Sequence, residues 1–429
     1  MCARYVDEGS QDFPIIREDF LGFIPIYDQS ARSLTKVISD RCKALSLDMP
    51  KCVRQGYDGA SVMGGHVSGV QSRIRQVSPK ARYVHCASHR LNLALSKTMS
   101  IPAIRNCLGV IHEVANFFRN YPTANEALKG AIVAKIPDSE KKRLVSLCET
   151  RFIERHDSVI SFVELFPCIC LALEEVSGMT KQISSTASTL LAAVEKSQFL
   201  VSLLVCEKLF IFTLPLSMFL QEKSLDLAKA LDHAKHAIET LDRLRKDSEE
   251  RFQKTLVAAE KMSLHVFGNK LVVPRTSSKQ THRANPETSM EQYYRVTIFV
   301  PAIDSLIQNL TDRFTLNEDV LPYFQILLPG FADPDKADEL ENLSDYFDDK
   351  VSLAAIKSEY EQWCAKISTV DKNVNVLKLL EYCDSTYYQN IRSLLIILAT
   401  LPVTTCAVGR SLSTMGRIKT LPRSVMGNE

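Results

Sequence analysis

The chain has 429 residues, of which 45% are hydrophobic and 24% are charged, and it contains 15 Gly and 17 Pro. This composition is typical of a globular protein and excludes a collagen-like or low-complexity chain. No uninterrupted apolar stretch reaches the roughly 18–20 residues of a membrane span, and the first residues lack the regions of a signal peptide. The 12 cysteines follow no repeating framework, so we expect them to be reduced thiols. Without an export signal or a membrane span, we expect an intracellular protein that does not associate with a membrane.

The formal net charge of +2 hides a strong asymmetry along the sequence. Residues 30–105 contain 13 Lys and Arg against 3 acids, whereas residues 321–384 contain 13 Asp and Glu against 6 Lys. The basic block could therefore bind a polyanion, and the acidic block could repel one or cover a basic surface. Two solvated faces that offset each other explain the same counts, because a linear count does not show spatial clustering.

The sequence after residue 20 begins with a strand-like and then a helix-like pattern. Phe20–Tyr27 is an apolar, aromatic-rich run with the length of a strand. Over residues 31–45, apolar side chains recur at spacings of three and four, which predicts a helix that begins after Ser30.

The alternation continues to about residue 100. A strand is expected before the turn-forming sequence YDGA, and a helix follows with Val67, Val70 and Ile74 on one face. Residues 81–86 form the next strand candidate, and residues 87–99 the next helix candidate. Strands and helices that alternate at this spacing favour an α/β domain.

From about residue 103 the pattern is almost wholly helical. Its clearest helical region covers residues 225–267, where packing in a bundle is favoured over a lone coiled coil. Residues 269–290 have no period and two Pro, which is typical of a long exposed loop. Residues 331–349 are acidic and rich in turn formers, and residues 387–403 contain an apolar run too short to span a membrane.

Asp58 lies in a Gly-flanked turn after an expected strand. A carboxylate at the end of a central strand can hold a divalent cation and a phosphodiester, as nucleotidyl transfer requires. An Asp-Gly pair is more often simply a turn. The residues alone therefore leave both interpretations open.

Cys86 and His89 are separated by two residues, a spacing that can place both side chains on one side of a helical turn. Either residue can bind zinc, but a structural zinc site needs about four ligands, and no neighbouring pair of Cys or His completes the set. Core packing or an orienting hydrogen bond is therefore favoured, since a free Cys is usually a small buried hydrophobe. We predict no metal here.

Arg151 lies in the charged sequence CETRFIERHD. Its neighbours can form ion pairs along one helix, and an arginine beside an aromatic residue can alternatively reach a phosphate. The sequence contains no phosphate-binding loop, nucleophile elbow, zinc-protease motif or dinucleotide fingerprint. Composition and residue spacing thus predict a protein with an α/β part and a helical part, and they do not indicate an activity.

Four blocks resemble hAT-superfamily DNA transposases, in particular host-adopted relatives that carry MYM-type zinc-finger or THAP domains. The blocks include the sequences RQGYDGASVMGG, LCETRFIERHDSV, HRANPETSMEQYYRV and LPVTTCAVGRSLST. They occur in the same order as in the family, from near the first residue to the last.

The resemblance implies a fold that combines α/β and all-α parts, namely an incomplete ribonuclease-H-like core interrupted by a large helical insertion. Residues 1–105 would form the partial core, and residues 106–385 the mainly helical insertion, with an exposed loop near 269–290. Residues 386–429 would begin the C-terminal dimerisation region and return to the core. Relative to the family, the chain is expected to be truncated at both ends.

The resemblance also assigns site residues. Active relatives cut DNA with three acidic side chains that hold two divalent metal ions. Asp58 matches the second acidic position, Cys86 and His89 match a C-x-x-H motif that supports the core, and Arg151 matches an arginine of the next block. The first acidic strand would precede the sequence RYVD and is absent, and the third acidic position aligns with Gly409.

With two of three acids missing, the resemblance implies a transposase-derived protein that is catalytically inactive and needs no cofactor. It would act by association with itself or with related transposase-like chains, and it could contact DNA. The resemblance favours a nuclear over a cytoplasmic location. The alternative is a truncated gene model of a DDE-type DNA transposase that performs strand cleavage and transfer with Mg²⁺ or Mn²⁺.

Overall fold

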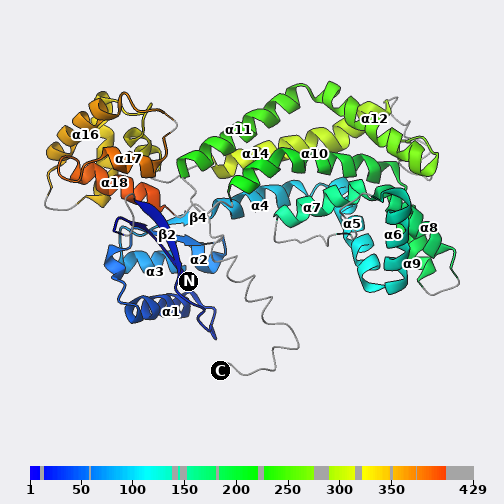
Figure 1. Ribbon diagram of the computed structural model, residues 1–429, viewed down its shortest axis with the longest axis horizontal. Coiled ribbons are helices and arrows are strands. Elements are labelled where there is room, and N and C mark those ends of the chain that lie inside the picture. Colours follow the sequence, from blue (N-terminus) through cyan, green and yellow to red (C-terminus); the bar gives the residue numbers. More distant parts are fainter. Residues whose placement is uncertain are drawn as a thin grey trace. The chain divides into compact units, whose positions relative to one another are not determined.

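A computed structural model describes residues 1–9, 14–57, 59–137, 144, 152–179, 183–220, 227–274, 289–314, 321–347, 351–372 and 374–401. For residues 152–155, 227–231 and 321–322 it describes the backbone alone. The chain divides into two compact units, each assembled from separated segments (Figure 1). Unit 1 comprises Met1–Arg90, Phe219–His233 and Phe314–Glu429, and unit 2 comprises Leu91–Met218 and Ala234–Arg313.

The units divide the chain differently from the three segments expected from the resemblance. Unit 1 brings the acidic sequence after residue 321 together with the basic N-terminal sequence. The assignment of residues 1–105, 106–385 and 386–429 to ancestral domains stays a prediction.

Unit 1 contains four short strands among its described residues, together with mostly short helices. Its N-terminal elements are β1 (Cys2–Asp7), β2 (Ile15–Phe20), α1 (Ala31–Ala44), η1 (Met49–Lys51), β3 (Arg54–Tyr57), α2 (Ser61–Gly64), α3 (Val70–Val77) and β4 (Arg82–His85). Its later elements are α15 (Leu321–Phe324), η3 (Gln325–Leu327), η4 (Pro334–Tyr346), α16 (Leu353–Ile367), α17 (Val376–Tyr382) and α18 (Gln389–Thr400). β1 pairs with β2 antiparallel and β3 with β4 parallel, as two separate two-stranded sheets.

The β1–β2 pair has one face toward the helices and one face toward solvent. Val6 lies opposite Ile16, and both pack against the hydrophobic core formed by the later helices. Tyr5 lies opposite Arg17 on the other face, because successive side chains of a strand alternate. The sequence of each strand thus carries a period of two.

Two local expectations were wrong. The strand expected at Phe20–Tyr27 ends at its first residue, since β2 finishes at Phe20. Gly22 follows with φ 106°, a conformation that breaks an extended ladder, and Pro25 has no N–H to donate. Val67 is 93% exposed and precedes α3, so it does not share the buried face of that helix.

The predicted helix after Ser30 is confirmed as α1. The Ser30 hydroxyl accepts a hydrogen bond from the Ser33 N–H at 3.3 Å, which caps the helix. α1 packs against α3, and a small hydrophobic cluster centred on Val70, Ile74 and Ala81 fills the space beside β3. The predicted strand at residues 81–86 is likewise confirmed as β4.

The larger core of unit 1 lies among η4, α16, α17 and α18. Trp363 is fully buried, and its Nε1 donates to the Leu327 carbonyl at 3.0 Å. Arg4 of β1 donates to the Ala399 carbonyl at 3.2 Å, so the first strand is tied directly to α18. Both ends of the described chain therefore meet in one unit.

Unit 2 contains helices and no strand among its described residues (Figure 1). The helix α4 (Ala87–Thr98), predicted at residues 87–99, crosses from unit 1 into unit 2. The others are α5 (Pro102–Asn120), α6 (Pro122–Lys135), α7 (Phe152–Glu164), α8 (Phe166–Ser177), α9 (Ser184–Val194), α10 (Ser197–Phe219), α11 (Leu227–Lys246), α12 (Ser248–Phe267), α13 (Met290–Tyr294), the π-helical segment η2 (Arg295–Phe299) and α14 (Val300–Phe314). Like α4, α11 contains residues of both units, because the middle segment of unit 1 ends at His233. α8 packs between α6 and α9, and α5 contacts both of them.

Among the described helices, α10 is long and apolar enough to cross a membrane by length and composition. About 67% of its most apolar window is buried inside the protein. Glu207 and Lys208 lie in its middle, and the Lys208 ammonium donates to the Arg251 carbonyl at 3.0 Å. The burial is typical of the central helix of a soluble bundle, which passes the same test.

The helical region expected over residues 225–267 is two helices. α11 ends at Lys246, and Asp247 has φ −91° and ψ 22°, outside helical values. Glu249 and Glu250 lie in the first turn of α12, where acidic side chains favour a helix start. Taken together, the described residues are mostly helical with four short strands, in agreement with the expected combination of α/β and all-α parts at this coarse level.

Candidate functional site

The parallel pair β3–β4 places a row of aromatic rings beside the turn in which the sequence predicts a site. The ring centroids of Tyr57 and Tyr83 are 6.0 Å apart, and those of Tyr83 and His85 are 6.2 Å apart, both stacked. The ring of His89, on the first turn of α4, lies 5.3 Å from that of His85. The rings on one face of the β3–β4 pair thus form a column, and His89 extends this column onto α4.

The turn after β3 lies directly against this column. A Cβ atom on Gly59 would lie 2.7 Å from Cε1 and 2.8 Å from Nε2 of His85. Contacts this short do not occur between real Cβ atoms and their neighbours, so a side chain at position 59 would displace the imidazole. The close approach explains the glycine at this position.

Cys86 and His89 lie where β4 meets α4. Cys86 is 3% exposed; its N–H donates to the Tyr57 carbonyl at 3.2 Å, and its carbonyl accepts from the Arg90 N–H at 2.9 Å. Within the described part of the chain, no group of three or more His, Cys, Asp or Glu side chains could hold a metal ion. The assignment of Cys86 and His89 as supports of the core stays a prediction.

The other predicted site residues lie outside the described residues. These are Asp58, at the second acidic position, Arg151, the possible phosphate contact, and Gly409, at the third acidic position.

The best-defined electrostatic cluster of unit 1 lies at the other end of β3 and β4. Arg54 and Arg82 are direct partners in the β3–β4 register. Arg82 pairs with the Asp345 carboxylate, and the Arg54 guanidinium lies over the ring of Tyr346 at 5.0 Å. Lys80, just before β4, donates to the Phe347 carbonyl at 3.1 Å. Three consecutive residues of the acidic block thus cover three cations of the basic block.

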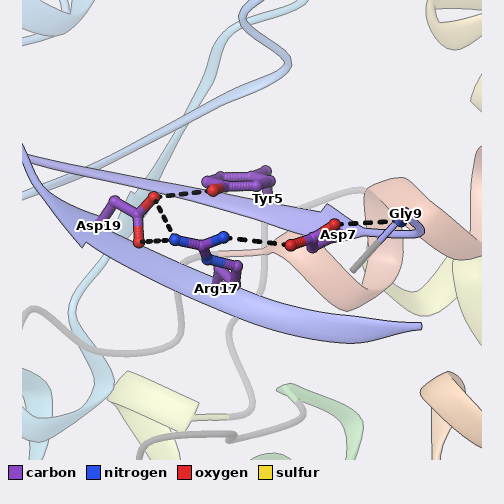
Figure 2. A network of polar contacts seen from close by, with 5 residues as sticks. All are labelled: Tyr5, Asp7, Gly9, Arg17 and Asp19. Atoms are coloured by element: carbon purple, nitrogen blue, oxygen red, sulfur yellow. Dashed lines mark hydrogen bonds and ion pairs between the residues drawn. The ribbon is translucent and has the colours of Figure 1, made fainter. Parts of the chain in front are cut away.

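Figure 2 shows a second polar network, on the exposed face of the β1–β2 pair. Arg17 donates to Asp7 at 3.1 Å and to both oxygens of Asp19 at 3.2 Å. The Tyr5 hydroxyl donates to Asp19 at 2.7 Å, and this hydrogen bond raises the pKa of Tyr5. The arginine joins carboxylates on both strands, so the network fastens β1 to β2.

Burial keeps the ionisable groups beside the small cluster of unit 1 neutral. It raises the pKa of Tyr57 well above the ordinary range, and it also raises the pKa of Cys42 and Cys52. A thiol with a raised pKa is a poor nucleophile at neutral pH, because the reactive species is the thiolate. These groups therefore support packing rather than covalent catalysis.

Sequence reasoning missed the cluster at Arg54, Lys80 and Arg82. The counts of charge indicated a basic block and an acidic block and allowed that one covers the other, but they did not say which residues meet. The signal that could have singled out these residues was the position of two arginines on two successive expected strands.

Comparison with known proteins supports the resemblance at the level of the host-adopted relatives. A family model described as "DUF4371: ZMYM1/FAM200, RNase-like domain" matches residues 1–69. The chain is also 26% identical over 423 residues to the "52 kDa repressor of the inhibitor of the protein kinase" of Homo sapiens, which covers 94% of this chain and 54% of that protein. The Mus musculus protein of the same name is 26% identical over 422 residues, with the same coverage. The chain therefore spans about half the length of these curated relatives, and it is similar to an RNase-like domain family at its N-terminal end.

Proposed function

We propose that this chain is a transposase-derived protein of the hAT type that associates with itself or with related chains and contacts DNA without cutting it. On this proposal it acts in the nucleus and needs no metal or other cofactor. The observation that carries the proposal is a similarity over 94% of the chain to proteins named as repressors. Repression is an activity that association can supply without strand cleavage.

The expected lack of cleavage is argued from the sequence. The third acidic position of the hAT pattern aligns with Gly409, which has no side chain to bind a metal ion. A two-metal centre stabilises both the attacking and the leaving oxygen of the phosphodiester, and carboxylates must hold both ions in place. Asp58 without this companion is insufficient for that task.

The expected contact with DNA rests on the basic block. Arg32, Lys36 and Lys43 of α1 are all exposed, and their spacings of four and seven residues place them on one side of the helix. A row of exposed cations contributes phosphate contacts that do not depend on the base sequence.

A cleavage assay tests the catalytic part of the proposal. The purified chain and the Asp58→Ala variant are incubated with supercoiled plasmid DNA and either Mg²⁺ or Mn²⁺. We expect no nicking by either protein above a protein-free control. Metal-dependent nicking that Asp58→Ala abolishes would overturn the proposal in favour of an active DDE-type transposase.

Sedimentation velocity tests the association. We expect the average sedimentation coefficient to increase with protein concentration in the micromolar range, as a self-associating protein requires. A single monomer boundary over the whole range, together with no binding of the chain to labelled duplex DNA at low salt, would refute both parts of the proposed mode of action.

A further inference from the structure

The cluster formed by Arg54, Lys80 and Arg82 has the features of an anion site that this chain itself occupies. Arg54 and Arg82 lie side by side because the parallel register pairs them directly, and neighbouring strands are about 4.8 Å apart. Like charges directly opposite one another destabilise a sheet. A negative group beside the pair therefore offsets this repulsion.

The acidic segment at the end of η4 supplies such a group to Arg82. Asp345 places one carboxylate on Arg82, whereas Phe347 offers Lys80 a neutral carbonyl oxygen. Tyr346 is 6% exposed, and its ring contacts that of Phe324 at 5.6 Å, so this residue is anchored in the core of unit 1. Tyr346 consequently holds Arg54 in place, whereas the carboxylate of Asp345 on Arg82 is the exposed partner that a competing anion can replace.

The Arg82–Asp345 pair is accessible to a competitor. The Asp345 side chain is 54% exposed and that of Arg82 is 31% exposed. Exposed ion pairs contribute little to stability because water and salt screen them. A phosphate group accepts charge-assisted hydrogen bonds from arginine as a carboxylate does. DNA brings many phosphate groups to one surface.

We propose that Lys80 and Arg82, with Arg54 held beside them by Tyr346, bind the phosphate backbone of DNA, and that Asp345 competes for this site within the same chain. The proposal deepens the contact with DNA put forward above and rests on it. It adds these cations to the exposed row on α1 and names the group that limits their contact with DNA.

The test measures binding of fluorescently labelled duplex DNA by fluorescence anisotropy across a series of salt concentrations. Asp345→Asn removes the competing charge and should tighten binding about fivefold to tenfold near 0.1 M salt, as one added phosphate contact would. The slope of log affinity against log salt should steepen by about 0.9 for the same reason.

Asp338→Asn is the matched control, because it makes the same change of charge on the same segment. Asp338 is ion-paired with Lys357 rather than with the cluster, and its side chain is 88% exposed. This variant should bind DNA like the unmodified chain. The double variant Arg82→Gln/Asp345→Asn should lose the gain seen with Asp345→Asn alone, and circular dichroism checks that all variants are folded.

The outcomes separate this inference from the proposed function. If the unmodified chain binds DNA and Asp345→Asn behaves like Asp338→Asn, the inference fails and the general contact with DNA stands. A gain that survives in the double variant also overturns the inference, because Arg82 then makes no contact. If no variant binds DNA even at low salt, both the inference and the DNA part of the proposed function are refuted.

Discussion

The two units are stabilised in different ways. In unit 2, α8 and α10 bury most of their side chains, and rings such as those of Phe162, Phe166 and Phe199 contact one another in the interior. In unit 1, arginine side chains donate to backbone carbonyls outside their own element, and one of these contacts joins the N-terminal segment to the C-terminal one. Arg4 donates to Ala399, and Arg392 donates from one nitrogen to Leu380 and Cys383.

The difference follows from how each unit is assembled. Unit 1 combines three separated segments of the chain, and its two sheets have only two strands each. Two-stranded sheets are marginal by themselves, so a few charged hydrogen bonds have a large share in joining the segments. Unit 2 spreads its stability over many apolar contacts, none of which is singly decisive.

The largest effect is expected from a cavity in unit 2. Leu173 and Leu171 lie on α8; the first is fully buried, and the second is 38% exposed. Leu173→Ala should lower the free energy of unfolding by about 2–5 kcal/mol, because it removes buried methyl groups and leaves a void. Leu171→Ala makes the same change of side chain and should cost less than about 1 kcal/mol.

Tryptophan fluorescence and circular dichroism together show which unit Leu173→Ala destabilises. The single tryptophan, Trp363, lies in unit 1, whereas circular dichroism reports the helices of both units. In urea, Leu173→Ala should shift the circular dichroism transition more than the fluorescence transition. Equal costs for the two leucine variants would contradict the description of unit 2.

The next effect tests the polar links of unit 1. The Arg392 side chain is 19% exposed; it donates to the Leu380 and Cys383 carbonyls at 2.7 Å each and pairs with Glu8. Arg392→Met leaves both carbonyls without this donor and should cost about 2–3 kcal/mol. Glu8→Gln removes only an exposed ion pair and should cost less than about 1 kcal/mol.

The fluorescence of Trp363 in urea measures both variants. A shift of the fluorescence transition by Arg392→Met with little change for Glu8→Gln is expected. If Glu8→Gln were as damaging, the ion pair that joins the C-terminal segment to the N-terminal one, rather than the two carbonyl contacts within the C-terminal segment, would make the larger contribution.

The sequence predicted those helices and strands that are determined by residues close to one another in the chain. Ser30 marked the start of α1, and the short run at residues 81–86 marked β4, because caps and strand-forming runs are set within a few residues. β1 and β2 were missed as strands. The solvent-facing sides of these strands carry residues such as Tyr5 and Arg17. The alternation of polar and apolar residues is therefore hard to recognise until the helices that cover the inner face are known.

The candidate site was predicted less completely than the fold. Cys86 and His89 lie in described positions, and their neighbourhood with the rings of Tyr57 and Tyr83 depends on a parallel register that no local signal fixes. The pairing of Arg82 with Asp345 joins residues 263 positions apart. Such a contact depends on how the segments of unit 1 assemble, and charge counts alone do not determine it.

A smaller effect is expected at alkaline pH. Burial raises the pKa of the Cys383 thiol from its ordinary value of 9.0 to about 12. Above pH 9 the unfolded chain loses this proton and the folded chain keeps it, so the free energy of unfolding falls as the pH rises toward 12. The loss should be on the order of 1 kcal/mol for each pH unit.

Cys383→Ala separates this titration from packing. The variant lowers stability at all pH values because it removes buried volume and the contact of the thiol with the Tyr388 carbonyl. Its fluorescence transition in urea should nevertheless depend less steeply on pH above 9. Parallel curves for the two proteins would show that this thiol does not titrate on unfolding.

The smallest effect is expected at an exposed ion pair, and it completes the contrast between buried and exposed polar groups in unit 1. A hydrogen bond from Lys357 lowers the pKa of Asp338 below its ordinary value of 3.8. The folded carboxyl group therefore stays ionised at lower pH than the unfolded one. The contribution of this ion pair to stability is present above about pH 3.8 and is lost as the pH falls through the lowered pKa.

Asp338→Asn should thus reduce the melting temperature slightly near neutral pH. The difference in melting temperature between the variant and the unmodified chain should vanish in strong acid, and also in high salt because an exposed pair is screened. A difference that persists under both conditions would mean that the side chain acts through packing, and that even exposed acids of η4 help to hold unit 1 together.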